Sequence, residues 1–492
     1  MKKLFIPLVG LTLLAGCNFL QKEPLTSITP NNFFTSADDA ESSLTAVYDA
    51  LQGGGAYGQD LLTMGEMPSD NCTSVSNDVN ALETIAWTPN TSQVGNVFRQ
   101  AYLCINRANI VLKYVPTIAM DTARRSQIQG EARFVRALSY FNLVRAYGDV
   151  PLHLTPSESA SPAELNLPRT PAAAVYDQIV ADLSRAAIQM NTSNPNRAVK
   201  NSANGLLARV QLTQRNWAAA QAAANKVVGT SIALNNTFRS LFPAENKGAE
   251  SLFEVQFAGT PDGSNLLPDE ILPFPLTTYS FSKFNLPTAE LISYVDTVND
   301  QRWAYVGNIT NNNKFVGRNH VSYIDSRKNQ AINNATNDRG NFPYKWTSIG
   351  NNFNSVDNTY VLRYAEVLLA YAEATNELSG PTGDGLAKLN LVRQRAGLPA
   401  LTLGSPQAAT KQTLRNEIDR QRRLELAFEG ERWFDLLRYA RHNQAEAGAH
   451  TVSALDLIGQ FRNGNRDVNY LLFPIPQAEI NTNPQLKQNP GY

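Results

Sequence analysis

Apolar residues recur at helical spacing along most of the chain. Segments with this pattern are 38–51, 97–114, 121–147, 171–190, 202–214, 216–229, 359–379 and 384–396. Each repeats apolar positions every three to four residues, the period of an amphipathic helix. Ser36 stands where an N-terminal cap of the first helix belongs. The hydrophobic pattern therefore predicts a mostly α fold.

The strongest pattern lies in residues 414–441, which predict two helices broken at Gly430. Glu425 falls within the apolar stripe of the first helix. A buried carboxylate is costly unless a cation pairs with it, so Arg422 or Arg432 is expected as its partner. The acids of this stretch could also pair as general acid and base. Nearby arginines would keep them ionised, which favours a structural ion pair over catalysis.

Small residues in the segment from 202 to 229 allow helices to approach closely. Ala208, Ala220 and Ala224 lie at contact positions, and Trp217 lies near the turn between the two helices. This arrangement is typical of tetratricopeptide helix pairs. Similar pairs at 359–379 with 384–396 and in the 414–441 hairpin predict a scaffold of about four helical pairs.

Helical periodicity is absent from two stretches. Residues 53–96 are rich in Gly, Asn, Ser and Asp and predict a long irregular segment, of a length that is often functional. Between 251 and 360, short β-prone pieces such as LFEVQF alternate with amides and many aromatic residues. We expect this second stretch to be a loop-rich, partly β insertion, with many of its aromatic rings packed beneath long loops.

The first residues have the pattern of a bacterial lipoprotein signal. Two lysines precede an apolar run that is too short to span a bilayer, and the run ends in the lipobox sequence LAGC at Cys17. We expect residues 1–16 to be removed, Cys17 to carry the lipid, and residues 17–32 to form a polar tether. No later segment is apolar enough to cross a membrane, so residues 33–492 are predicted to be one folded domain.

Composition argues against several other functions. Lysine plus arginine equals aspartate plus glutamate at 43 each, so no basic field is present to bind nucleic acid. His442, Glu446 and His450 have the spacing of a metal site on a helix, but Gly448 argues against that helix and an exposed polar face is favoured. No common catalytic or nucleotide-binding motif occurs, and no cofactor or enzyme activity is expected. Paired carboxylates of the glycosidase type stay open, because their separation depends on the fold.

The two remaining cysteines can be interpreted in two ways. Cys72 and Cys104 could form a disulfide, but Cys104 lies among the small apolar residues of a predicted helix. A buried free thiol is therefore favoured for Cys104.

Several ordered motifs give the chain a resemblance to a known family. They are GEARFVRALSYFNLVRAYGDVPL, SLFEVQF, RYAEVLLAYAEATNELSG, LNLVRQRAGLP, RRLELAFEGERWFDLLRY and LLFPIPQAEINTNPQLKQNPGY. In this order, and with the lipobox, they resemble the SusD/RagB family of outer-membrane lipoproteins. The resemblance implies tetratricopeptide-like pairs, binding of glycans or peptides without hydrolysis, and pairing with a SusC-like TonB-dependent transporter as its lid. It also implies that the lipid-anchored protein is exposed at the cell surface.

The quoted motifs are scaffold motifs, so the expected ligand residues rest on chemistry. Sugar rings stack on aromatic side chains, while amides and carboxylates bind their hydroxyls. The candidate residues are Trp303, Tyr305, Tyr323 and Trp346 in the insertion 251–360, with Asp70 and Asn71 in the segment 53–96. For each ring, packing in the core is the alternative. Segments 33–250 and 361–492 are expected to supply the helical scaffold.

An oligosaccharide is the expected ligand because both segments combine aromatic residues with many amides. Two alternatives stay open at this point. A peptide nutrient would find the same neutral, amide-rich surface, and a scaffold of helical repeats could bind proteins only.

Overall fold

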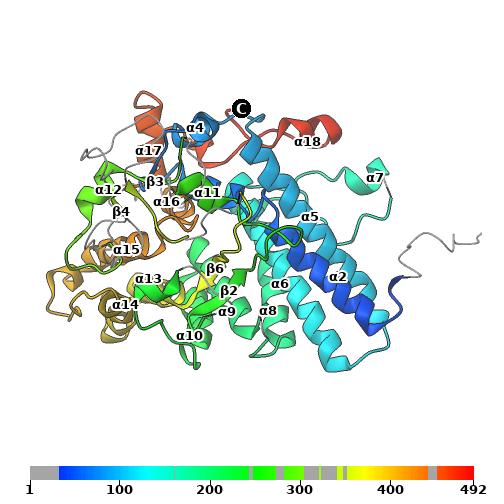
Figure 1. The fold of residues 1–492 in the computed structure, drawn as a ribbon, viewed down its shortest axis with the longest axis horizontal. Helices are drawn as coiled ribbons and strands as arrows, with labels where there is room; N and C mark the ends of the chain where they lie inside the picture. The colour runs from blue at the N-terminus through cyan, green and yellow to red at the C-terminus, as the bar shows by residue number, and fades with distance from the viewer. Residues whose placement is uncertain are drawn as a thin grey trace, which may run out of the picture.

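The computed structural model describes residues 33–159, 161–194, 196–242, 248–272, 277, 282–303, 321–322, 341–346, 352–441 and 452–492. Within these ranges the protein is mostly helical (Figure 1). Among the helices described, none is long and apolar enough to cross a membrane.

A stack of long helices forms the body of the molecule. The N-terminal helices are α2 (Ala37–Asp49), α5 (Ser92–Tyr114), α6 (Thr122–Tyr147), α8 (Ala172–Gln189), α9 (Lys200–Thr213) and α10 (Trp217–Val228). The C-terminal helices are α13 (Tyr364–Ser379), α14 (Gly383–Arg395), α15 (Lys411–Leu426) and α16 (Arg432–Arg441). Neighbours pack in the order α5, α6, α8, α9, α10, α13, with α14 and α15 both against α13. This continuous stack is consistent with a tetratricopeptide-like scaffold and confirms the predicted fold class.

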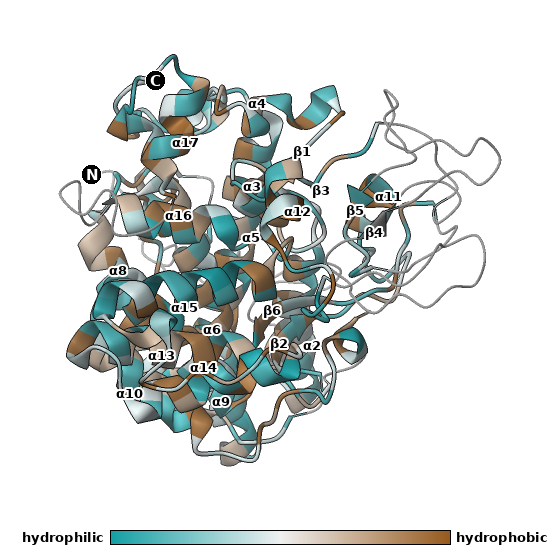
Figure 2. Ribbon diagram, turned by 90° about the vertical axis from the view of Figure 1, so that its left-hand side faces the viewer, coloured by the Kyte–Doolittle hydropathy of each residue, from teal (hydrophilic) through white to brown (hydrophobic). Residues whose placement is uncertain are grey.

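The remaining described α-helices are short. They are α3 (Asp60–Glu66), α4 (Asn80–Glu83), α7 (Pro162–Leu165), α11 (Leu267–Ile271), α12 (Ala289–Tyr294), α17 (Ala454–Phe461) and α18 (Gln477–Thr482). Helices α4 and α17 lie at one end of the molecule, and α9 and α10 lie at the other (Figures 1 and 2).

The predicted helices in the long segments are confirmed to within a few residues at most ends. The first helix has the expected cap: the Ser36 side chain accepts a hydrogen bond from the Asp39 N–H, and the Asp39 carboxylate accepts one in return. The prediction was wrong for the start of 359–379, because residues 359–363 form strand β6 before α13 begins. It was also wrong for 53–96 as a wholly irregular segment, since α3 and α4 lie within it. Helix α3 consists wholly of buried residues, so it has no amphipathic period to detect.

The strands pair in three small antiparallel sheets. Strand β1 (Cys72–Thr73) pairs with β3 (Leu286–Pro287), β2 (Ser251–Val255) pairs with β6 (Thr359–Arg363), and β4 (Val321–Ser322) pairs with β5 (Asn341–Phe342). The expectation that the insertion is partly β is therefore confirmed in its described residues. The β1–β3 pair joins the segment 53–96 to the insertion 251–360.

Helices α15 and α16 meet at Gly430, as the sequence predicted, and α3 packs directly against this turn. Gly430 has a φ of +80°, which favours glycine. A Cβ atom added to Gly65 of α3 would lie only 1.9 Å from the carbonyl oxygen of Gly430, so the two backbones are in direct contact. Glu66, the last residue of α3, accepts hydrogen bonds from the backbone N–H groups of Phe428 (2.9 Å) and Gly430 (3.0 Å). These contacts attach the end of α3 to the turn between the C-terminal helices α15 and α16.

Glu425 is buried in an ion pair, as expected, but its predicted partners were wrong. Arg363 and Arg395 both contact Glu425, and Arg302 lies 3.2 Å from it. The cluster continues through further buried groups, which are Glu250, Asp300, Lys345 and Glu429. We call these eight residues the ion cluster. Burial alone would raise the pKa of Glu425, but the three arginines outweigh burial and hold the pKa well below its usual range.

The arginines that were expected to pair with Glu425 serve neighbouring carboxylates instead. Arg422 contacts Asp435 (2.7 Å) and Glu366 (2.9 Å), while Arg432 contacts Asp70 and Asp419. The helical period placed Glu425 on the buried face, but the partners come from β6, α14 and the insertion. Their identity depends on tertiary packing, which local spacing does not encode.

Candidate functional site

A recess of about 580 Å³ opens where the β1–β3 pair meets α12 and α17. We call it the β1 recess. Its lining residues are Ser69, Asp70, Cys72, Thr73, Glu83, Thr288, Glu290, Val452, Asp456, Leu457, Gln460 and Phe461. Its volume lies within the range of roughly 300–1,000 Å³ typical of small-ligand sites. Glu83 of α4 and four residues of α17 line the recess, and these two helices lie at one end of the molecule (Figure 2).

The rim of the β1 recess combines an exposed aromatic ring with several carboxylates. Phe461, at the end of α17, is 39% exposed, and Gln460 beside it is exposed. Glu290 and Asp456 each form an ion pair at the rim, with Arg423 (2.9 Å) and Arg466 (3.0 Å) respectively. An apolar ring surrounded by hydrogen-bonding groups can bind a ligand that has both apolar faces and hydroxyls.

The floor of the recess is held in place by hydrogen bonds. Thr73 Oγ1 donates to Glu83 (2.8 Å), and Thr288 Oγ1 donates to the Asp70 carbonyl oxygen (3.1 Å). Thr288 also caps α12 by accepting from the Leu291 N–H. The described part of the recess is therefore preformed, which lowers the conformational entropy lost on binding.

Asp70 lines the β1 recess, but its carboxylate is engaged by two guanidinium groups. Arg432 contacts both of its oxygens (2.8 and 3.0 Å), and Arg423 lies 3.3 Å away. Burial acts to raise the pKa of Asp70, but the charges of Arg432 and Arg423 prevail and lower it. Asp70 is thus an ionised group that joins the recess to α15 and α16.

Asn71 lies beneath the recess and does not line it. Its side chain is fully buried, donating to Glu66 (2.8 Å) and accepting from Arg423 Nε (2.8 Å). A ligand on the surface cannot reach an amide in this position. The prediction of Asn71 as a direct ligand contact is therefore corrected to a support for its neighbour Asp70.

The structure places Trp303 and Trp346 in the core. Trp303 is 0% exposed and lies 6.1 Å, centroid to centroid, from Phe428. Trp346 is 4% exposed and lines a small internal space with Leu62. Neither ring has a free face on which a sugar could stack, so both expectations are corrected to core packing. The sequence shows that aromatic residues are enriched in this segment, but it does not show how deeply each ring is buried.

Other predicted sites fall outside the described residues. They are Cys17 with the tether, Tyr305 and Tyr323, and the histidine and glutamate positions 442, 446 and 450. No cluster of three or more metal-binding side chains occurs in the part of the chain that the structure describes. Cys72 and Cys104 are both buried free thiols, so the favoured interpretation of Cys104 is confirmed.

The recess residues that sequence reasoning missed are Phe461, Glu83, Glu290 and Asp456. Ser453 and Asp456 form a capping box, a signal that would have predicted α17 itself. No sequence signal links α17 to the β1–β3 pair, because the two lie more than 150 residues apart in the chain and meet only through the fold.

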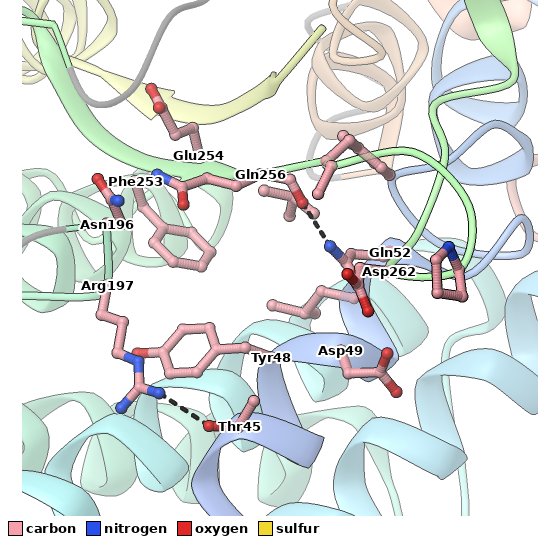
Figure 3. Close-up of a pocket in the computed structure, with 15 residues that line it drawn as sticks. Thr45, Tyr48, Asp49, Gln52, Asn196, Arg197, Phe253, Glu254, Gln256 and Asp262 are labelled. Carbon is pink, nitrogen blue, oxygen red and sulfur yellow. Dashed lines mark hydrogen bonds between the residues drawn. The ribbon is translucent and has the colours of Figure 1, made fainter. Parts of the chain in front are cut away.

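A second recess lies beside α2 and β2, which we call the α2 groove (Figure 3). Its volume is about 550 Å³, and it shares no lining residue with the β1 recess. Figure 3 shows the rings of Tyr48 and Phe253 on one side of the groove and the carboxylates of Asp49 and Asp262 on the other. Arg197 lies over the Tyr48 ring (5.4 Å) and donates to Thr45 Oγ1 (2.9 Å).

Tyr48 is held firmly by its hydroxyl group. That group donates to Glu131 (2.7 Å) and accepts from the Ala198 N–H (3.1 Å). Burial, together with the charge of Glu131, raises the pKa of the Tyr48 phenol well above its ordinary value. Tyr48 therefore presents a fixed, neutral ring to the groove.

Comparisons with known proteins agree with this architecture. A family model described as "SusD family" matches residues 284–492, and one described as "Starch-binding associating with outer membrane" matches residues 18–212. A SusD-like protein of Formosa agariphila is 28% identical over the full length of both chains. The starch-binding protein SusD of Bacteroides thetaiotaomicron is 24% identical, covering 90% of this chain and 87% of that protein.

Solved structures show the same fold. A laminarin-binding SusD-like protein superposes with a TM-score of 0.75 at 26% identity, covering 93% of this chain and all of that one. A SusD homologue of Bacteroides thetaiotaomicron gives a TM-score of 0.75 at 23% identity over 94% of this chain and 98% of that one. Two family models that together span both halves, full-length relatives and matching structures lead to one conclusion: this chain is a member of the SusD/RagB family.

Proposed function

We propose that the protein binds oligosaccharides at the cell surface and delivers them to a TonB-dependent outer-membrane transporter, for which it acts as a lid. Membership of the SusD/RagB family supports this proposal, as does the structural similarity to a laminarin-binding protein. The description of the N-terminal family model, which names starch binding and the outer membrane, supports it further.

The β1 recess is the proposed glycan site. The observation that carries this choice is the exposed Phe461 ring beside a preformed floor of hydroxyl and carboxylate groups, at the junction of segments 53–96 and 251–360. Pyranose rings have apolar C–H faces that pack on an aromatic ring, and their hydroxyls donate to carboxylates. A shallow site of this kind gains affinity from several sugar units at once, so chains longer than a disaccharide are the proposed ligands.

Binding without hydrolysis is the proposed outcome, because three of the four carboxylates that line the recess, Asp70, Glu290 and Asp456, are engaged in ion pairs. The fourth, Glu83, accepts hydrogen bonds from Thr73 Oγ1 and the Ser74 N–H.

Burial acts to raise the pKa of Asp70, but the charges of Arg432 and Arg423 lower it and keep the carboxylate ionised. A general acid needs the opposite, a raised pKa. Burial does raise the pKa of Glu66 to about 7, but Glu66 lies beneath the recess and is held by the N–H groups of Phe428 and Gly430. It cannot reach a glycosidic bond in this position.

Calorimetry can test the proposal with the mature protein. We expect binding of at least one member of a panel of neutral glycan oligosaccharides, including laminarin, starch, mannan and xylan fragments, and no binding of peptides. Phe461→Ala should weaken that binding about fivefold, since a lost ring contact is worth about 1 kcal/mol. Leu103→Ala is the control, because Leu103 is 40% exposed on α5 and does not line the recess.

Three outcomes would oppose the proposal. Binding of peptides alone would favour a peptide transporter component, and release of sugar products by the purified protein would favour an enzyme. Unchanged glycan affinity in Phe461→Ala would move the site away from the β1 recess.

The anchor and the partner need separate tests. The sequence LAGC supports lipidation of Cys17, so Cys17→Ala should move the protein from the membrane fraction to the soluble fraction. Absence of palmitate labelling in the wild-type protein would contradict the anchor. Purification in mild detergent should recover a large barrel protein with the lipoprotein. Repeated recovery of the lipoprotein alone would contradict the lid model.

A further inference from the structure

The α2 groove has rigid walls that do not depend on the β1 recess. Gln52 of the segment after α2 donates from Nε2 to the backbone carbonyl oxygen of Gln256 (2.6 Å), as Figure 3 shows. Beyond Gln256 the chain turns back, and Asn354 Oδ1 accepts hydrogen bonds from Thr260 N–H (2.6 Å) and Ser264 Oγ (2.5 Å). These bonds hold the 256–264 turn in place, so the groove is preorganised.

One amide nitrogen in the groove is buried but has no hydrogen-bond partner among the described residues. It is the Nε2 atom of Gln256. Leaving a buried donor unpaired costs free energy, and native proteins contain few such groups. The rest of the Gln256 side chain is only half-buried and lines the groove, so a rotation of its amide brings this donor to an acceptor oxygen of a bound ligand.

The other lining groups define the chemistry of that ligand. Asp262 and Asn196 are exposed at the rim, so together they offer both acceptors and donors. The Tyr48 ring supplies an apolar surface fixed by hydrogen bonds to its hydroxyl. Paired donors and acceptors next to a ring suit a compound with many hydroxyl groups.

An extended peptide is a poorer fit, although the groove runs beside strand β2. A peptide that binds a strand edge uses the edge's free backbone groups. The Leu252 carbonyl oxygen already accepts from Ser202 Oγ, and the Gln256 carbonyl oxygen already accepts from Gln52. Two carbonyls along this edge are therefore closed to a third strand.

We propose that the α2 groove is a second oligosaccharide-binding site, independent of the β1 recess. This inference rests on the proposed function, because it assumes that the protein meets glycans. Asn196, Gln256 and Asp262 hydrogen-bond the sugar hydroxyls, and Tyr48 packs against a sugar face.

Variants can separate ligand contacts from folding. Gln256→Leu removes the unpaired amide, so thermal stability should be kept while affinity at the groove falls about fivefold. The double variant Asn196→Ala/Asp262→Ala changes two exposed side chains and should lower that affinity about tenfold, the effect of two lost hydrogen bonds. The matched control is Asp177→Ala/Asn225→Ala, which removes one exposed acid and one exposed amide from α8 and α10.

Hydrogen exchange measured by mass spectrometry identifies the site directly. With the panel oligosaccharide that the wild-type protein binds most tightly, we expect slower exchange in peptides covering 45–52 and 253–262. The protection should persist in Phe461→Ala and be reduced in Asn196→Ala/Asp262→Ala at the same oligosaccharide concentration. Calorimetry of the wild-type protein should fit two sites per chain.

Each alternative result has a distinct meaning. Glycan binding that fits one site, with no protection at 45–52 and 253–262, would overturn the second site and leave the proposed function standing. Protection of these peptides by a peptide ligand rather than a sugar would also overturn it. If no panel glycan binds at all, the proposed function itself fails and this inference fails with it.

Discussion

The ion cluster and the β1 recess each gather four carboxylates, yet the two regions differ in burial and in ion pairing. In the ion cluster, four cations accompany four acids, all with side chains at most 8% exposed, and Arg363 alone contacts three of the acids. In the β1 recess, the side chain of Glu290 is 61% exposed, and Asp456 pairs with an arginine that is itself 64% exposed. Burial and the number of partners, and not the residue type, separate a structural carboxylate from one that can meet a ligand.

The two regions are connected through α3 and the segment that follows it. Glu66 accepts from the backbone of the α15–α16 turn, and Asn71 and Asp70 accept from Arg423 and Arg432. The floor of the β1 recess is thus attached to the helices that carry Glu425 and Glu429. We expect substitutions in the ion cluster to disturb the structure of the recess as well. Substitutions at the recess rim should leave the ion cluster unchanged.

The largest effect is expected from Arg363→Ala. This change removes the cation that contacts Glu250, Glu425 and Glu429 together, and breaking a buried ion pair costs about 3–5 kcal/mol. Urea unfolding followed by circular dichroism measures the loss. Arg466→Ala is the control from the recess rim, where an exposed pair contributes less than about 1 kcal/mol. Equal losses in the two variants would remove the contrast between the regions.

Trp303→Ala should lower the free energy of unfolding by about 3–5 kcal/mol, the cost of removing a large buried aromatic ring. Urea unfolding again provides the measurement. Trp303→Phe keeps much of the packing and should cost less. A Trp303→Ala protein with wild-type stability but weakened glycan binding would restore Trp303 to the ligand surface and contradict its burial.

Acid should destabilise the folded protein by protonating buried carboxylates that are ion-paired at neutral pH. Burial acts to raise the pKa of Asp435, but Arg422 and Arg438 prevail and lower it from 3.8 to about 2. A lowered folded-state pKa gives stability that is present above about pH 4 and is lost as the pH falls towards 2. For Asp435 this contribution is on the order of 2 kcal/mol. Urea unfolding from pH 5 to pH 2 measures it.

Asp435→Asn provides the comparison for the acid effect. It should lower stability at pH 7 and give a shallower decline between pH 4 and pH 2 than the wild-type protein shows. An identical slope in the two proteins would mean that Asp435 does not contribute to acid unfolding.

The smallest effect is expected from Glu290→Gln at the recess rim. The exposed ion pair with Arg423 contributes less than about 1 kcal/mol, so stability should hardly change. Glycan affinity should fall by about two- to fivefold, because a charged acceptor is replaced by a neutral one. Calorimetry and thermal unfolding of the same preparation test both expectations. A fall in stability as large as that of Arg363→Ala would show that Glu290 stabilises the fold in the way the ion-cluster carboxylates do.

Much of the helical scaffold could be predicted from the sequence, whereas most of the site could not. The break at Gly430 and the cap at Ser36 depend only on residues that are close together in the sequence, so the sequence alone predicts them. The partners of Glu425 and the approach of Phe461 to the β1–β3 pair depend on contacts between distant segments. Aromatic enrichment pointed to Trp303, but enrichment alone does not distinguish a buried ring from an exposed one.

A crystal structure of the mature protein with a bound panel oligosaccharide would locate the glycan site. We expect a sugar ring packed on Phe461, with hydroxyl groups within hydrogen-bond distance of the Glu290 or Asp456 carboxylate. A sugar bound elsewhere, with the β1 recess empty and Phe461 exposed as before, would contradict this expectation.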